Sequence, residues 1–287
     1  MALAYTVVCA RRGWFEFAPL RLRTRAPAGL FAADRRVAAP GAGVLIFPEY
    51  RVLERFPLLD RRPATQDPYA RVGPGSEFLG VREYRPGDAP RHVHWRTTAR
   101  AGRLVVREFA EETRPGLAIA LDVRASSVIG GEADNTLERA IKVAATLVHY
   151  ADAHALSVEV FAESVAWPAP PGPLSRWAAL SYLARVPGDG ERPFADCLGR
   201  LGAAVFVAAL LPAPDEAAAP ALIGLRRLGA EVLAVLIDPA PFVPAQAGRA
   251  AGLAASLRAA GVSVRVIGDE PDWERTLVAE DRAAVRW

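Results

Sequence analysis

Lysine is nearly absent from this chain of 287 residues, since Lys142 is the only lysine among 35 basic residues. The other basic residues are arginines, and alanine, glycine and proline are abundant, as a bias in codon composition would produce. The richness in arginine is therefore weak support for nucleic-acid binding. Cysteine is also scarce: Cys9 and Cys197 are the only two, and neither lies in a C-x-x-C or Cys/His ligand pattern. This scarcity argues against a disulfide framework and fits a reducing compartment.

The chain also lacks a long hydrophobic run. Its longest uncharged stretch, residues 201–214, contains two prolines and is shorter than the about 20 apolar residues that span a bilayer. The apolar start at residues 1–10 ends at Arg11 and Arg12, too early for the core and cleavage site of a signal peptide. We expect the chain as given to be soluble and cytoplasmic.

The common enzyme motifs are missing as well. The sequence has no G-x-x-x-x-G-K-[ST] loop, no H-E-x-x-H pair and no G-x-S-x-G elbow with the partners of a catalytic triad. Gly41 and Gly43 lie outside any strand-to-helix context, so they do not indicate a dinucleotide site. These absences favour a binding protein over an enzyme.

From Gly116 onward the sequence alternates between apolar strands and helical segments. The predicted strands are 117–123, 157–161, 204–211, 232–238 and 262–267, and the predicted helices are 135–154, 174–186, 194–201, 246–260 and 271–279. Continuous apolar strands joined by helices predict βαβ units and a mainly parallel sheet covered on both faces. We therefore expect a doubly wound α/β domain over residues 116–287.

Upstream of this domain, residues 1–60 favour a small antiparallel β region. Strands are predicted at 5–9, 14–24 and 44–48, with Gly13 at a hairpin turn. The first strand begins without any lead-in, so we expect the region to lack its start. Residues 61–115 are expected to form a signature and linker segment that packs between the β region and the α/β domain.

Charge is divided unevenly along the chain. Residues 1–115 contain 20 basic and 12 acidic residues, whereas the remainder contains 15 basic and 20 acidic residues. Two interpretations stay open. Either the basic half faces phosphates, anionic lipid or an acidic partner, or the two halves face each other.

The loop after the first strand of the α/β domain is a candidate site, because ligands of such folds bind at the carboxyl ends of the strands. Its sequence Asp122-x-Arg124-x-Ser126-Ser127 is similar to the D-x-S-x-S start of a metal-ion-dependent adhesion site, whose oxygen ligands suit Mg²⁺. Arg124, however, puts a fixed positive charge where the cation would lie, and strand 207–211 supplies no later aspartate. We therefore favour a salt bridge between Arg124 and a carboxylate, and we expect no cofactor.

The most specific pattern lies between the two halves, in residues 75–109. The positions singled out there are Arg82, Glu83, Tyr84, Asp88, Arg91, His94, Trp95, Arg100, Arg107 and Glu108. Because arginine forks suit carboxylates, these residues either join the β region to the α/β domain or form a partner-binding surface. His92 and His94 could together hold a metal ion, but structural hydrogen bonds are the favoured interpretation.

This pattern resembles the signature of the domain-of-unknown-function 58 family. The matching pieces are Arg82-Glu83-Tyr84, Pro86-Gly87-Asp88, Val93-His94-Trp95, Ala99-Arg100 and Leu104-x-x-Arg107-Glu108, with upstream landmarks at Arg11-Arg12-Gly13 and Phe47-Pro48. The resemblance implies a von Willebrand factor A-like domain in a bacterial protein, often encoded beside a MoxR-type AAA+ ATPase. Many members carry N-terminal membrane helices that are not seen in this sequence, and a longer form would lie at the inner face of the membrane.

Three functions are compatible with these features. The first is a non-enzymatic adaptor or assembly factor that binds a protein partner, a MoxR-type AAA+ ATPase, through the α/β domain and its Asp122 loop. The second is a divalent-metal-dependent binder or enzyme at that loop. The third is binding of nucleic acid or an anionic membrane by the basic N-terminal half, which ranks last because acidic residues are interspersed and no reader motif is present.

Overall fold

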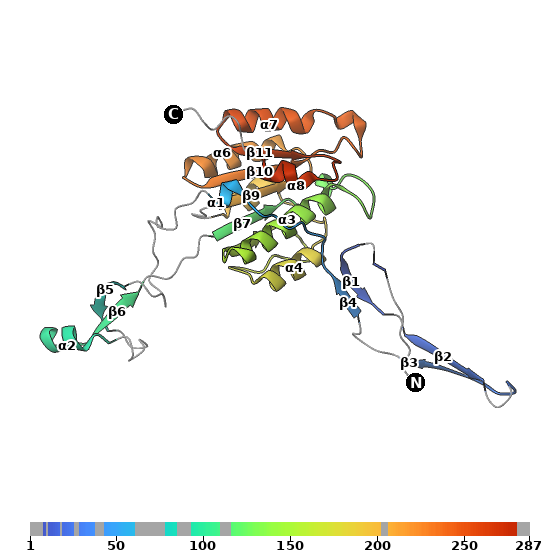
Figure 1. The fold of residues 1–287 in the computed structure, drawn as a ribbon, viewed down its shortest axis with the longest axis horizontal. Helices are drawn as coiled ribbons and strands as arrows, with labels where there is room; N and C mark the ends of the chain where they lie inside the picture. The colour runs from blue at the N-terminus through green and yellow to red at the C-terminus, as the bar shows by residue number, and fades with distance from the viewer. Residues whose placement is uncertain are drawn as a thin grey trace. The chain divides into compact units, whose positions relative to one another are not determined.

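The computed structural model describes residues 8–9, 11–17, 19–25, 29–37, 43–60, 78–84, 93–109, 116–201 and 206–279. The chain divides into two compact units. One unit comprises Met1–Asp60 and Leu117–Trp287, and the other comprises Arg61–Gly116. Figure 1 shows the elements of each unit.

A five-stranded sheet forms the centre of the larger unit, in the order β11-β10-β9-β7-β8. Figure 1 labels its strands β11, β10, β9 and β7. Its strands are β7 (Gly116–Leu121), β8 (Ser157–Phe161), β9 (Phe206–Leu211), β10 (Glu231–Ile237) and β11 (Ser263–Ile267). The pairs β7–β9, β9–β10 and β10–β11 are parallel. The central strands are almost wholly apolar, as strands that are covered on both faces require.

Helices cover both faces of this sheet. Its flanking helices are α3 (Thr136–Ala153), α4 (Arg176–Arg185), α5 (Phe194–Gly199), α6 (Ala219–Arg227), α7 (Arg249–Ala259) and α8 (Trp273–Val278). Alternate residues of a strand point to opposite faces. Ile119 and Leu121 therefore pack with α3, α4 and α8, whereas Ala118 and Ala120 pack with α5, α6 and α7. Two separate apolar layers result.

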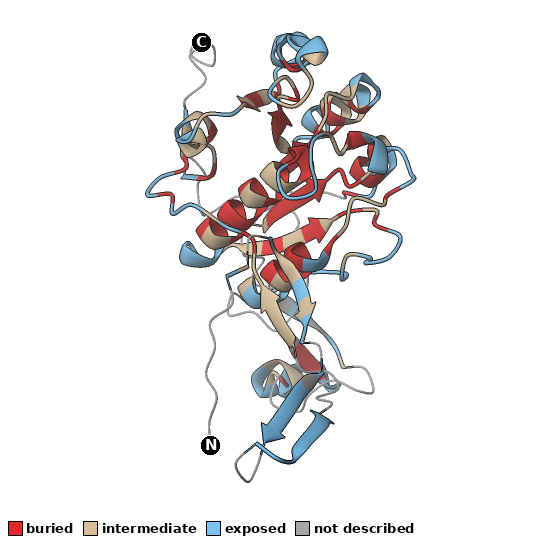
Figure 2. Ribbon diagram, turned by 90° about the vertical axis from the view of Figure 1, so that its right-hand side faces the viewer, coloured by how far each residue is buried: buried red, intermediate tan, exposed pale blue. Residues whose placement is uncertain are grey.

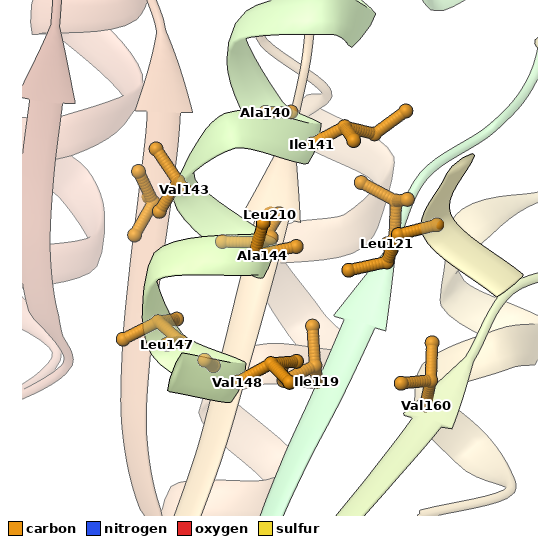
Figure 3. Packing of buried hydrophobic residues seen from close by; sticks show 14 of the residues in the cluster. Ile119, Leu121, Ala140, Ile141, Val143, Ala144, Leu147, Val148, Val160 and Leu210 are labelled. Atoms are coloured by element: carbon orange, nitrogen blue, oxygen red, sulfur yellow. The ribbon is translucent and has the colours of Figure 1, made fainter. Parts of the chain in front are cut away.

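The packing of α3 shows how the first layer is built. Ala140 and Ala144 bring the helix close to the sheet, Val148 lies beside Ile119, and Ile141 lies nearer to Leu121 (Figure 3). The helix begins at a capping residue, because the Asn135 side chain accepts a hydrogen bond from the Glu138 amide at 2.9 Å. This cap fixes the start of α3 next to the loop that leaves β7.

Part of the N-terminal segment also packs on this unit. β1 (Gly13–Glu16) pairs antiparallel with β4 (Gly43–Ile46). Just before β1, the partly buried Arg12 guanidinium binds Glu138, with 2.9 Å between Nε and Oε2, and donates to the Val186 carbonyl at 2.8 Å. A charge-assisted fork of this kind ties β1 to α3 and to the end of α4.

The segment before α1 (Pro57–Asp60) belongs to the same core. Phe56 is 0% exposed, and its ring meets those of Tyr150 and Phe206 edge-on, with centroids 5.8 Å and 6.3 Å away. The Tyr150 hydroxyl donates to Asp60, whose Oδ2 also accepts from the Phe56 amide at 3.0 Å. Residues 53–60 are therefore a structural part of the α/β unit.

A second two-stranded sheet in this unit differs from β1–β4 in its burial. β2 (Leu20–Arg25) pairs antiparallel with β3 (Ala32–Val37). Every described side chain of these two strands is exposed, and both strands are pale blue over most of their length in Figure 2. The described side chains of this hairpin therefore belong to neither apolar layer of the unit.

The smaller unit is a hairpin with a helix in its connection. β5 (Phe78–Glu83) pairs antiparallel with β6 (Val105–Phe109), and α2 (Trp95–Ala101) precedes β6. Val93, Val105 and Val106 are its buried apolar residues among those described. Gly102 ends α2 in the left-handed conformation, at φ 68°, which glycine adopts without steric cost.

The predicted fold class is confirmed. Each of the strands and helices expected over residues 116–287 is present, with ends shifted by a few residues. α6 is an additional helix that the sequence prediction lacks. Pro220 lies in its first turn, where proline is tolerated. The segment 14–24, expected as one strand, forms β1 and β2 with different partners.

Two further expectations concern the rest of the chain. The predicted strand 5–9 falls mainly outside the described residues, and packing of residues 61–115 between the other parts stays a prediction. In the part of the chain that the structure describes, no helix has the length and apolar character needed to cross a membrane.

The packing of Phe56 yields a prediction about stability. Phe56→Ala should lower the free energy of unfolding by about 3–5 kcal/mol, because it removes a wholly buried ring and leaves a cavity against Tyr150 and Phe206. Val52→Ala, at a side chain that is 71% exposed, is the matched control and should change it by less than about 0.5 kcal/mol. Urea denaturation followed by circular dichroism measures both. Equal effects would show that residues 53–60 are not part of the core.

Candidate functional site

The candidate site lies where the strand order of the large sheet reverses. β7 lies between β9 and β8. The chain passes from β7 to β8 on one side, and it then crosses to β9 and continues through β10 to β11 on the other side. In open α/β sheets, ligands bind outside the carboxyl ends of the strands at such a switch point. Asp122 directly follows β7, and Asp215 follows β9 by four residues. The two carboxylates therefore come from the two strands that flank the switch point.

The backbone after β7 is held by its neighbours. The Asp122 amide donates to the Leu210 carbonyl at 3.0 Å, which extends the β7–β9 ladder by one residue. Gly190 then pairs with this segment: its amide donates to the Val123 carbonyl at 2.8 Å, and its carbonyl accepts from Ala125. A Cβ on Gly190 would lie 2.8 Å from the Glu163 carbonyl oxygen, so only glycine fits this close approach.

Asp122 is a buried carboxylate whose two oxygens are both bonded. The residue is 1% exposed. Oδ1 accepts from the Arg124 amide at 3.1 Å and from Arg124 Nε at 3.0 Å. Oδ2 accepts from Arg124 Nη2 at 2.8 Å and from Ser127 Oγ at 2.6 Å. A buried charge requires compensation of this kind, and the bidentate guanidinium supplies it.

Arg124 also binds the second carboxylate. Its Nη2 lies 2.6 Å from Asp215 Oδ2, so one guanidinium links the loops after β7 and β9. The other oxygen of Asp215 accepts from the Ala217 amide at 3.0 Å and caps the short 3-10 helix Glu216–Ala218. The side chains of Arg124 and Asp215 are 21% and 14% exposed, so the bridge lies just below the surface.

Hydroxyl groups complete the inner side of the site. Ser127 ends the 3-10 helix Ala125–Ser127 and is buried, whereas the neighbouring Ser126 is exposed. Thr136, at the start of α3, donates from Oγ1 to the Ser127 carbonyl at 2.9 Å and accepts from the Ile129 amide at 3.0 Å. Thr136 therefore holds the loop, and Ser127 rather than Ser126 supplies the hydroxyl that binds Asp122.

The electrostatics of the site keep Arg124 charged. The hydrogen bond to Asp122 raises the pKa of Arg124; burial opposes this, and the charges of Asp122 and Asp215 add to the rise. The guanidinium therefore remains a cation over the whole physiological range of pH. It lies against both carboxylates, where a divalent ion would need to bind them. As arranged, this donor set does not fit Mg²⁺, which demands free oxygen ligands in octahedral geometry.

The loops around this bridge are strongly acidic. The connections that leave the carboxyl ends of β7, β8, β9, β10 and β11 contain Arg124 as their one basic residue. Their acidic residues are Asp122, Glu132, Asp134, Glu163, Asp215, Glu216, Asp238, Asp269, Glu270 and Asp272. Several are well exposed, with Glu132 at 87% and Asp269 at 72%, although Arg11 and Arg139 of neighbouring segments pair with them at 2.7 Å. We call this set of loops the carboxyl edge; apart from Arg124, its own charged residues are all acidic.

A pocket beside β8 offers a second place for a ligand. Its volume is about 250 Å³, and Glu159, Glu163, Cys197 and Arg200 are among its lining residues. Burial, followed by the nearby charge of Glu163, raises the pKa of the Cys197 thiol to about 12. A thiol with this pKa is not a nucleophile at neutral pH. Within the described part of the chain, no group of histidine, cysteine and carboxylate side chains is arranged to hold a metal ion.

The signature residues lie in the smaller unit as far as they are described. His94 caps α2, because its Nδ1 accepts from the Thr97 amide at 3.2 Å. This contact agrees with the structural interpretation of His94. Trp95 is 67% exposed at the first turn of α2, and Arg100 is exposed at its last turn. Trp95 thus offers a large apolar surface with a polar edge.

The carboxylates of the signature are only partly described. Glu83 lies 3.6 Å from Arg103 across the hairpin, and both side chains are about two-thirds exposed, so this pair contributes little to stability. Tyr84 is half-buried, and its amide donates to the Leu104 carbonyl at 2.9 Å. Asp88 and Arg91, like His92, lie outside the described residues. Arg82, Arg107 and Glu108 are placed only by strand register, opposite Val106, Val81 and Gly80.

Asp215 is the site residue that the sequence prediction misses. The similarity to a metal-ion-dependent adhesion site places a second aspartate at the end of the apolar strand 207–211, whereas Asp215 follows this strand after Pro212-Ala213-Pro214. A carboxylate within one short loop of an apolar strand end, rather than at the strand end itself, is the signal that would have identified it.

Comparison with known proteins gives one match to a family. Residues 80–179 match the family described as protein of unknown function DUF58. The match begins in β5, includes the described signature residues and ends in α4, so it contains the Asp122 loop. No curated protein matches the chain.

The buried pair generates a prediction about stability. Arg124→Ala should lower the free energy of unfolding by about 3–5 kcal/mol, because it leaves the Asp122 carboxylate buried without a counter-charge. The double variant Asp122→Ala/Arg124→Ala should be more stable than Arg124→Ala alone, since it removes the unpaired charge. Chemical denaturation of the variants measures both effects.

Arg275→Ala is the matched control for this experiment. Arg275 pairs with Asp272 at 3.2 Å, but their side chains are 81% and 55% exposed, so its loss should cost less than about 1 kcal/mol. If Arg124→Ala were as mild as Arg275→Ala, the bridge would not be a buried constraint of the fold.

Proposed function

We propose that this protein is a non-enzymatic adaptor or assembly factor that binds a protein partner, a MoxR-type AAA+ ATPase, through the carboxyl edge of its α/β unit. The observation that carries the proposal is the Arg124 bridge. Asp122 and Asp215 stand where a ligand-binding centre is expected, yet they are joined by a fixed guanidinium rather than left free for a metal or a substrate.

The arrangement of the loops supports the interpretation of this unit as a von Willebrand factor A-like domain. A carboxylate follows the first strand, a serine hydroxyl binds it, a threonine begins the next helix, and a second carboxylate follows the strand across the switch point. Domains of this kind bind protein partners at this edge. The match of residues 80–179 to DUF58 supports the same proposal, because that resemblance implies a MoxR-type partner.

A metal-dependent binder or enzyme at the Asp122 loop is the alternative, and the geometry disfavours it. Nη2 of Arg124 lies 2.8 Å from Asp122 Oδ2 and 2.6 Å from Asp215 Oδ2. A divalent ion could reach both carboxylates only after this side chain moved away. That movement would break three side-chain hydrogen bonds of Arg124 and bring two positive charges together.

The charge of the carboxyl edge indicates the chemistry of the partner. Two carboxylates and one guanidinium leave the bridge itself with a formal charge of −1. The surrounding loops add the eight other acidic residues of the carboxyl edge, some of which pair with arginines of neighbouring elements, among them Glu132 with Arg11 and Asp269 with Arg139. A partner segment rich in arginine and lysine would meet a complementary potential, whereas an acidic segment would be repelled. We therefore infer that the ATPase presents a basic surface to this edge, in the cytoplasm where it hydrolyses ATP.

The experiment is a direct binding measurement with the MoxR-type ATPase from the same cell. Biolayer interferometry should detect binding of the full chain, and Glu132→Lys/Asp269→Lys should weaken it by about tenfold or more, because both substitutions place a like charge before a basic partner. Rising salt should reduce the affinity of the unsubstituted chain more than that of the variant.

Glu54→Lys/Asp152→Lys is the control with the same change in charge. Both residues are exposed but lie outside the carboxyl edge. The control should bind as the unsubstituted chain does. The proposal is contradicted if the ATPase does not bind, or if the two double variants lose affinity equally.

A further inference from the structure

The β2–β3 hairpin is a surface that the proposed function does not use. Its described strand side chains are all exposed, and a two-stranded hairpin without an apolar layer is only marginally stable in water. The register places Arg21 opposite Arg36, Arg23 opposite Asp34 and Arg25 opposite Ala32. The hairpin therefore has a defined pattern of side chains on each face, and among the described residues of its unit none buries the side chains of its two strands.

One face of the hairpin is an arginine face. Residues opposite each other in an antiparallel pair share a face, and so do residues two apart in one strand. By this rule the arginine face consists of Arg21, Arg23, Arg25 and Arg36, with Asp34 as its one acidic residue. Asp34 lies 3.1 Å from Arg23 and 3.9 Å from Arg21, so a single carboxylate is shared by two of the four arginines.

The opposite face and the tip are apolar by comparison. Leu22, Thr24 and Ala33 share the opposite face with Arg35. At the tip, Leu30 is 79% exposed and Phe31 is 70% exposed, which is unusual for two adjacent large apolar side chains. The hairpin thus combines an exposed apolar tip with a strip of positive charge that runs back from it along both strands.

We propose that the β2–β3 hairpin binds an anionic lipid bilayer. Leu30 and Phe31 enter the boundary between headgroups and acyl chains, and the arginine face lies on the lipid phosphates. Arginine suits this position, because its apolar stem can lie along lipid while the guanidinium binds phosphate with two parallel hydrogen bonds. Binding would also cover the surface that leaves the hairpin marginal in water.

The tip distinguishes a bilayer from the other anionic partners. Duplex nucleic acid would be held by the arginines through its phosphates, but Leu30 and Phe31 could enter it only by unstacking base pairs, which costs about a few kcal/mol per step. The acidic carboxyl edge of a second copy of this chain could likewise pair with the arginines, but its exposed large apolar side chains are Val165 and Trp167, both in the connection after β8. A bilayer presents phosphates and an apolar phase side by side, as the arginine face and the tip require.

The test is co-sedimentation of the full chain with vesicles. Phosphatidylcholine vesicles that contain phosphatidylglycerol should bind the chain, pure phosphatidylcholine vesicles should not, and rising salt should release it. Arg25→Ser/Arg36→Ser should lower the partition coefficient about fivefold for each arginine removed. Leu30→Ser/Phe31→Ser should lower it by at least about tenfold.

Two double variants elsewhere on the surface serve as matched controls. Arg227→Ser/Arg249→Ser removes the same charge from exposed sites, and Val165→Ser/Leu228→Ser removes exposed apolar side chains. Both should sediment with anionic vesicles as the unsubstituted chain does. Because every substituted side chain is exposed, thermal denaturation should give the same midpoint for all four variants.

Four results would overturn the proposal. The first is no sedimentation with anionic vesicles, and the second is equal sedimentation with neutral vesicles. The third is unchanged vesicle binding by Leu30→Ser/Phe31→Ser together with comparable binding to duplex DNA, which would indicate recognition of phosphate alone. The fourth is that the chain does not bind vesicles but self-associates in their absence, and that the hairpin variants abolish this self-association. That result would assign the hairpin to contact with a second copy of the chain. ATPase binding by the two hairpin variants should be unchanged, so failure of this proposal and failure of the adaptor function are distinguishable.

Discussion

The pairing of the buried Asp122 carboxylate with the Arg124 guanidinium is the constraint on which the candidate site depends. A carboxylate that is 1% exposed cannot remain charged without a close partner, and the sequence supplies that partner two residues later. The same guanidinium then holds Asp215, which caps the short helix after β9. One arginine therefore fixes the loops on both sides of the switch point, and the loops can present a rigid surface to a partner.

This constraint determines what chemistry the edge can perform. The positive charge between the two carboxylates is permanent, and as arranged it binds the oxygens that a metal ion would need. What remains is an ordered acidic surface, which suits recognition of a basic protein segment. The β2–β3 hairpin carries the opposite charge and an apolar tip, so the two surfaces suit different partners. A protein that binds a cytoplasmic ATPase with one surface and lipid with another would act as a physical link between them.

The fold was largely predictable from the sequence because its signals are strong and local. Continuous apolar strands such as 206–211 and 231–237, separated by helices with small residues at helical spacing, indicate a buried parallel sheet without any knowledge of tertiary contacts. The salt bridge of Arg124 was predictable for the same reason, since its partner is two residues away. Asp215 was not, because the contact joins residues 91 positions apart and depends on which strand lies next to β7. The burial of Phe56 against Tyr150 and Phe206 was likewise invisible, since it links the N-terminal segment to α3 and β9 through tertiary packing alone.

The most direct test of the account is a thermal denaturation series with Mg²⁺ and Mn²⁺ on the unsubstituted chain, on Arg124→Ser and on Asp122→Ala/Arg124→Ser. The account predicts that neither cation changes the midpoint of the unsubstituted chain, because Arg124 occupies the position between the carboxylates. In Arg124→Ser, Asp122, Asp215 and Ser127 are left as oxygen ligands, so both cations should raise the midpoint by several degrees, and the rise should vanish in the double variant. A cation-dependent rise in the unsubstituted chain that is as large as the rise in Arg124→Ser, and that the double variant lacks, would contradict the account, because it would show that the site binds metal with Arg124 in place.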